Sequence, residues 1–101
     1  MEYVIKVICV EPDGQKKYPV GAEFEFYVVY DDNDFFVATS ATISLQNAQI
    51  FDETIADEGE FEEFVNKIHH DLEKYANSFN LTIDRFELCE INFKEIAKIV
   101  V

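Results

Sequence analysis

The amino-acid sequence predicts an α+β domain, in which one antiparallel sheet of four to five strands carries a single helix across one face. The expected order of elements is β-β-β-α-β-β. Three observations predict it: a one-sided apolar stripe between positions 54 and 80, two alternating runs joined by a short polar loop before it, and β-branched stretches near both ends. With 101 residues, the chain is expected to form a single domain, residues 1–101.

The first expected strand runs from Tyr3 to Val10. Its residues are apolar on both alternations, with Lys6 as the exception. Strands that are buried on both faces have this pattern, so the strand is predicted to lie in the centre of the sheet. The turn sequence Glu11-Pro12-Asp13-Gly14 follows it directly.

Two alternating runs, residues 22–30 and 35–45, predict a β-hairpin whose more apolar face receives the helix. Between them stands Asp31-Asp32-Asn33-Asp34, which is expected to form the hairpin turn. A calcium loop is disfavoured there, because Phe35 and Phe36 occupy positions where further oxygen ligands would be needed. The opposite face of the hairpin carries carboxylates and aromatic side chains, and no second layer is expected to cover it.

The helix is predicted over Thr54 to Asn80. Its apolar residues recur at helical spacing on one side: Phe61, Phe64, Val65, Ile68, Leu72, Tyr75, Ala76 and Phe79. Asp57 is the expected N-cap, with Glu60 three residues later completing a capping box. Asn80 is expected to close the far end in the left-handed conformation.

After the helix, residues 81–93 are expected to be extended, and the alternation slips near Arg85 and Phe86, which predicts a β-bulge. Residues 94–101 allow two interpretations. The spacing of Phe93, Ile96, Ala97 and Val100 fits a helix, whereas the β-branched end favours a strand, and the strand is the interpretation adopted.

Charge is distributed unevenly along the chain. It holds 21 acidic and 8 basic residues, for a formal net charge of −13. Residues 18–66 contain twelve of the acids and no lysine or arginine, while the segments on either side are nearly neutral. Seven of the twelve residues from 52 to 63 are acidic; together they are called the acidic block: Asp52, Glu53, Asp57, Glu58, Glu60, Glu62 and Glu63.

Several functional classes are disfavoured. Direct binding to nucleic acid or to an anionic membrane would be repelled by the negative charge. No nucleophile motif or phosphate-binding glycine loop is present, so an enzyme is the weakest class and no cofactor is expected. His69 and Glu73 are four residues apart, but a third metal ligand at suitable spacing is missing. Cys9 and Cys89 are expected to be free, buried thiols.

The leading hypothesis is a small non-enzymatic binding protein whose acidic block engages a basic protein surface, such as a nuclease or another nucleic-acid-binding protein. Fixed carboxylates can mimic nucleic acid and occupy a phosphate-binding groove, so the protein would act as an inhibitor. The hairpin-turn acids Asp31, Asp32 and Asp34 are included as candidate contacts. The chain is similar to phage inhibitors of restriction or CRISPR effectors and to immunity proteins in size, acidity and lack of catalytic motifs, and no motif ties it to one family.

The alternative hypothesis is a self-associating structural or regulatory domain that forms a homodimer through the open sheet face, with acidity serving only solubility. No signal peptide or membrane-spanning stretch is expected from the sequence, which predicts a cytoplasmic protein.

Overall fold

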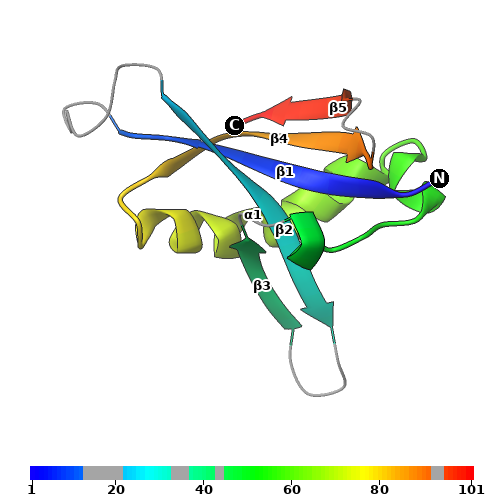
Figure 1. Cartoon of the computed structure of the whole chain (residues 1–101), viewed down its shortest axis with the longest axis horizontal. Helices are drawn as coiled ribbons and strands as arrows, with labels where there is room; N and C mark the ends of the chain where they lie inside the picture. The colour runs from blue at the N-terminus through cyan, green and yellow to red at the C-terminus, as the bar shows by residue number, and fades with distance from the viewer. Residues whose placement is uncertain (13–21, 33–36, 43–44, 92–94) are drawn as a thin grey trace.

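The computed structural model describes residues 1–12, 22–32, 37–42, 45–91 and 95–101. They form an α+β fold that consists of one five-stranded antiparallel sheet and a single α-helix (Figure 1). The strand order in the sheet is β3-β2-β1-β4-β5. The strands are β1 (Tyr3–Val10), β2 (Glu23–Asp32), β3 (Val37–Thr42), β4 (Thr82–Glu90) and β5 (Glu95–Val100). The predicted fold class and order of elements are confirmed.

The central position predicted for the first strand is correct. β1 pairs with β2 on one side and with β4 on the other. Alternate residues of β1, among them Ile5 and Val7, face the helix and belong to the hydrophobic core. Val4 and Ile8 point to the other face, yet they are also fully buried. A strand apolar on both alternations therefore lies where both of its faces are covered.

The helix α1 (Glu60–Asn77) packs on the sheet through the predicted apolar stripe. Val65, Ile68 and Leu72 are almost completely buried against the core strands. The hydroxyl of Tyr75 donates a hydrogen bond to the carbonyl oxygen of Ala41 in β3, at 3.0 Å. Phe79 is an exception, because it lies beyond the helix end and is 58% exposed.

The helix begins later than predicted. Residues 53–56 form a separate 3₁₀ turn, η2 (Glu53–Ala56), which follows a first 3₁₀ turn, η1 (Leu45–Asn47). Gly59 is the actual N-cap of α1, with φ of +80° and no side-chain cap, so the capping box predicted for Asp57 and Glu60 is wrong. The left-handed backbone at Gly59 separates the two helical segments, a conformation that glycine adopts without steric cost. Asn80, with φ of 59°, ends the segment as predicted.

The second strand extends further along the chain than predicted. Asp31 and Asp32 belong to β2 and pair with β3, so they are not turn residues. Leu45 starts η1 and does not extend β3. Residues 33–36, which include Asp34, lie outside the described residues, as do residues 13–21, which hold the second half of the first predicted turn, Asp13 and Gly14.

The C-terminal part agrees with the sequence. β4 and β5 are antiparallel neighbours, so the strand interpretation of the chain end is correct. The register between β1 and β4 shifts between Ile8 and Cys9, which leaves Asp84 as the extra residue of a β-bulge. The slip was predicted one residue further along the chain. Cys9 and Cys89 are both free and buried, as predicted.

Candidate functional site

The acidic block occupies the segment that leads into the helix, from Asp52 to the first turn of α1. Asp52 caps η2: its Oδ1 accepts hydrogen bonds from the backbone N–H of Thr54, at 3.0 Å, and from the Thr54 hydroxyl, at 2.5 Å. These bonds to the ionised form lower the pKa of Asp52. Glu53 forms an ion pair with the amino terminus of Met1, at 3.1 Å. These two acids therefore have local structural roles.

The remaining acids of the block have a different environment. Glu60, Glu62 and Glu63 lie in the first turn of α1, where the helix dipole stabilises each by about 0.3–1 kcal/mol. Asp57 and Glu58 lie in the link between η2 and α1. All five side chains are exposed, and within the described part of the chain none of them takes part in an ion pair. Their charge is therefore not neutralised locally.

The helix start divides the block into two flanks, each beside a groove. Asp52, Glu60 and Glu63 border a groove of about 400 Å³, whose apolar lining includes Phe51 and Phe64. The other groove, of about 370 Å³, lies toward β5; its acids are Asp57, Glu58 and Glu62. The sequence shows these acids as one block along the chain, and the division into two flanks follows only from the helical geometry of residues 60–63.

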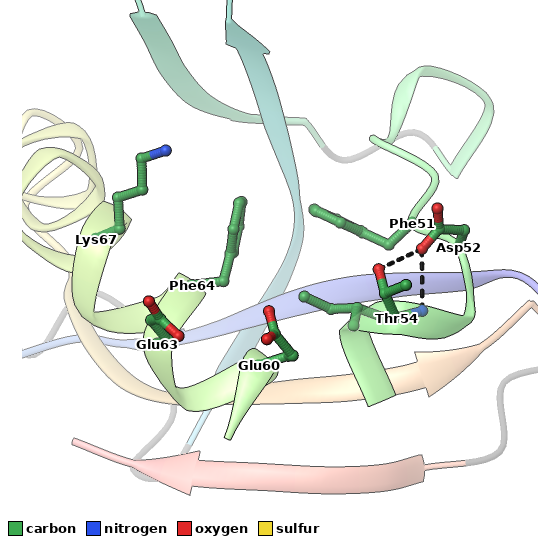
Figure 2. Close-up of a pocket in the computed structure, with 8 residues that line it drawn as sticks. Phe51, Asp52, Thr54, Glu60, Glu63, Phe64 and Lys67 are labelled. Carbon is green, nitrogen blue, oxygen red and sulfur yellow. Dashed lines mark hydrogen bonds between the residues drawn. The ribbon is translucent and has the colours of Figure 1, made fainter. Parts of the chain in front are cut away.

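Two phenylalanines line the first groove (Figure 2). Their ring centroids are 5.0 Å apart and the rings are nearly perpendicular, at 75°. Phe51 is held in place because its backbone N–H and carbonyl both bond to Tyr3 of β1, at 2.9 Å each. In Figure 2 the Phe64 ring projects from α1, and the Phe51 ring lies beside Asp52. This aromatic pair was not identified from the sequence, where Phe51 stood in the least regular segment.

Two of the three hairpin acids, Asp31 and Asp32, lie away from this surface. Asp31 and Asp32 lie at the end of β2, on the hairpin that projects away from the rest of the sheet in Figure 1. η2 and the start of α1 lie near the N-terminus in the same view. Asp34 is outside the described residues. Asp31 and Asp32, which the sequence included as candidate contacts, therefore lie away from the acidic block.

A second charged cluster lies on the open face of the sheet, around the single arginine of the chain. The Arg85 guanidinium on β4 reaches across β1 to Glu23 on β2, with two contacts of 2.9 and 3.0 Å. It also contacts Glu87 at 2.8 Å and Asp84 at 2.7 Å. These bonds raise the pKa of Arg85 further, and the bond from Arg85 lowers the pKa of Glu23.

This cluster was missed in the sequence because 62 positions separate Glu23 from Arg85. The one available signal was that the chain contains only one arginine, the residue best suited to bind several carboxylates at once. Nearby on the same face, the Lys6 ammonium lies 3.7 Å from Glu25. The cationic side chains of this face are thus placed among its carboxylates.

The histidine and the thiols that the sequence analysis considered lie close to the core of the described residues. His69 Nε2 and Glu73 Oε2 are 4.0 Å apart, and the His69 ring packs edge-on against Phe86. Among the described residues, no group of three or more potential ligands could hold a metal ion. Burial raises the pKa of the Cys9 thiol to about 11, so this thiol is a poor nucleophile near neutral pH.

Comparisons with known proteins give no further guide: no protein-family model, no curated protein and no solved structure matches this chain. Over the residues that the structure describes, no helix has the length and apolar character needed to cross a bilayer.

Proposed function

We propose that the chain is a non-enzymatic binding protein whose acidic block docks on the basic surface of a nucleic-acid-binding protein, such as a nuclease, and thereby inhibits it. In such a complex the carboxylates take the place of nucleic-acid phosphates in the partner's binding groove. Association would be fast and would weaken as the salt concentration rises.

The observation that carries this proposal is the contrast between exposure and pairing in the acidic block. Asp57, Glu58, Glu60, Glu62 and Glu63 are exposed, close in the chain, and not in ion pairs among the described residues. Concentrated like charge destabilises the folded state through self-repulsion. The helix dipole offsets part of this repulsion for the three residues in the first turn of α1. Their negative charge still attracts cations from the solvent side.

The open sheet face fits a self-associating surface less well. Glu23 and Glu25 are exposed there, and the Arg85 guanidinium is already bonded to three carboxylates of its own chain. Two copies that met through this face would bring carboxylates toward one another, which costs energy unless they are neutralised. The homodimer therefore remains the second candidate, without an observation that favours it.

The test is a pull-down from the lysate of the host cell, with the wild-type chain and with a variant in which Glu58, Glu62 and Glu63 are replaced by lysine. We expect the wild-type chain to retain basic nucleic-acid-binding proteins at low salt and to release them at high salt. The charge-reversed variant should fail to retain them.

A matched control keeps the same change in net charge but moves it elsewhere: Glu2→Lys, Asp71→Lys and Glu73→Lys, all at exposed positions outside the acidic block. This variant should still retain the partner. Circular dichroism of both variants establishes that each is folded. A partner that binds the block-reversed variant as tightly as the wild type would refute the proposal and make the sheet-face homodimer the better explanation.

A further inference from the structure

We infer that the groove lined by Phe51 and Phe64 binds an arginine side chain presented by the basic partner. The inference rests on the proposed function, because it names the group that the first flank of the acidic block recognises. It concerns one flank only, so it can fail while the proposed function stands.

The size and lining of the groove suit a long side chain with an apolar stem. Its volume is about 400 Å³, and Phe51, Ile55 and Phe64 provide its apolar lining. Phe51 and Phe64 are only partly buried, so ring surface is accessible from the groove. The methylene stem of an arginine or lysine can lie along such a surface. The positive head group is attracted to the faces of aromatic rings, an interaction worth about 0.5–1 kcal/mol at exposed sites.

The rim of the groove supplies negative charge. Asp52 borders the groove from the position just before η2, and Glu60 and Glu63 border it from the first turn of α1 (Figure 2). The Oδ1 atom of Asp52 already accepts two hydrogen bonds from Thr54, which hold that carboxylate in place. Glu60 and Glu63 form no ion pair within the described residues, so they can accept hydrogen bonds from an incoming cation.

Arginine fits this combination better than lysine. Its planar guanidinium can stack on an aromatic ring and donate two parallel hydrogen bonds to a carboxylate, whereas the lysine ammonium is a compact, strongly hydrated charge. Lys67 also lines the groove, but in Figure 2 its amino group points away from Glu60 and Glu63. The carboxylates of Asp52 and Glu60 are therefore the groups that would bind the guanidinium.

The second groove is a weaker candidate. It is bordered by Asp57, Glu58 and Glu62, but it also contains Lys98 of the edge strand β5. A lysine and a β-bulge on an edge strand are features that prevent another strand from pairing there. β5 has both, because its register with β4 shifts at Cys89. This flank serves as the internal control in the experiment.

The experiment is an NMR titration of the wild-type chain with the blocked peptide acetyl-Gly-Ser-Arg-Ser-Gly-amide, at about 0.1 M salt. A screening length of about 10 Å then limits the influence of one flank on the other. The same peptide with citrulline in place of arginine removes the charge and keeps the shape. We expect the arginine peptide to shift the backbone amide signals of residues 51–54 and 60–64, and the citrulline peptide to bind at least fivefold more weakly.

Two double variants with the same charge change locate the site. Glu60→Gln with Glu63→Gln alters the first flank and should weaken arginine-peptide binding about fivefold or more. Glu58→Gln with Glu62→Gln alters the second flank and should change it less than about twofold. Phe64→Leu keeps an apolar side chain but removes the ring, and should weaken binding about threefold.

The outcomes separate the two proposals. If both double variants weaken the arginine peptide equally, or if Phe64→Leu binds as the wild type does, the groove is not an arginine site. A lysate partner that is lost on block reversal but unaffected by Phe64→Leu refutes the groove site and leaves the proposed function intact. Conversely, selective binding of the arginine peptide by a chain whose pull-down partner ignores block reversal would support the groove and refute the proposed function.

Discussion

The open face of the sheet and the start of α1 both carry several carboxylates, but they use them in opposite ways. On the sheet, Glu23, Asp84 and Glu87 surround the Arg85 guanidinium within 3.0 Å. Arg85 is only 19% exposed at its side chain, and Glu87 is 9% exposed as a residue. In the acidic block, exposed glutamates stand side by side in the first turn of α1, outside any ion pair of the described residues.

The difference shows how one residue type can serve the fold in one region and act outward in another. The Arg85–Glu23 pair spans β1, and Ile8 of β1, which is opposite Arg85 in the register, is fully buried beneath this open face. On this face, charged side chains thus cover the apolar central strand. The acidic block covers no such strand, and its charge extends into solvent.

Loss of the helix packing should have the largest effect, because α1 holds the acidic block on the sheet. Ile68 and Leu72 are each 1% exposed. We expect Ile68→Ala and Leu72→Ala each to reduce the free energy of unfolding by about 2–5 kcal/mol. Lys74→Ala, an exposed position on the same helix, should reduce it by less than about 0.5 kcal/mol. Denaturant unfolding curves measure all three, and three equally mild effects would contradict the docking of α1.

Substitutions in the two charged regions should differ in their effect on the free energy of unfolding, by an intermediate amount. Arg85→Gln removes the partner of the nearly buried Glu87, and we expect a loss of about 1–3 kcal/mol. Glu63→Gln removes one of several like charges in the first turn of α1, and we expect a change within about 0.5 kcal/mol. The same denaturant curves test both. Similar losses for the two substitutions would mean that the acidic block is structurally paired after all.

Most of the fold could be predicted from the sequence, because hydrophobic periodicity determines it. The two apolar alternations of β1 and the helical stripe of α1 are properties of consecutive residues, and both were predicted correctly. The start of the helix was not, because Asp57 and Glu60 have the spacing of a capping box while Gly59 adopts a left-handed backbone. The spacing of the capping residues favoured a helix start at Asp57, whereas the left-handed backbone at Gly59 places the start at Glu60.

The candidate site was predicted only in part. Its acids were identified by composition, but their division into two flanks depends on which way each residue of the first turn points. The aromatic pair depends on a bridge between Tyr3 and Phe51, and the Arg85 cluster depends on the register of three strands. Such contacts join residues far apart in the chain, and they cannot be predicted from the pattern of consecutive residues.

The smallest expected effect concerns the pH dependence of the Glu23–Arg85 pair. The hydrogen bond from Arg85 lowers the pKa of Glu23 in the folded state below its ordinary value of 4.5. A carboxyl group with a lowered folded pKa contributes stability above its unfolded pKa, and this contribution is lost as the pH falls through the folded pKa. The difference in unfolding free energy between wild type and Glu23→Gln should therefore be greatest near pH 7 and should shrink below about pH 4.

The Arg85→Gln background provides the control, because it removes the cation while leaving Glu23 in place. In that background, replacing Glu23 by glutamine should have little effect on unfolding between pH 7 and pH 3. The four chains form a double-mutant cycle, whose coupling free energy should decrease as the pH falls. A coupling that stays constant over this range would mean that packing of the two side chains, and not the ion pair, links β2 to β4. The contrast between the two charged regions would then lose its electrostatic basis on the sheet side, while the unpaired state of the acidic block would be unaffected.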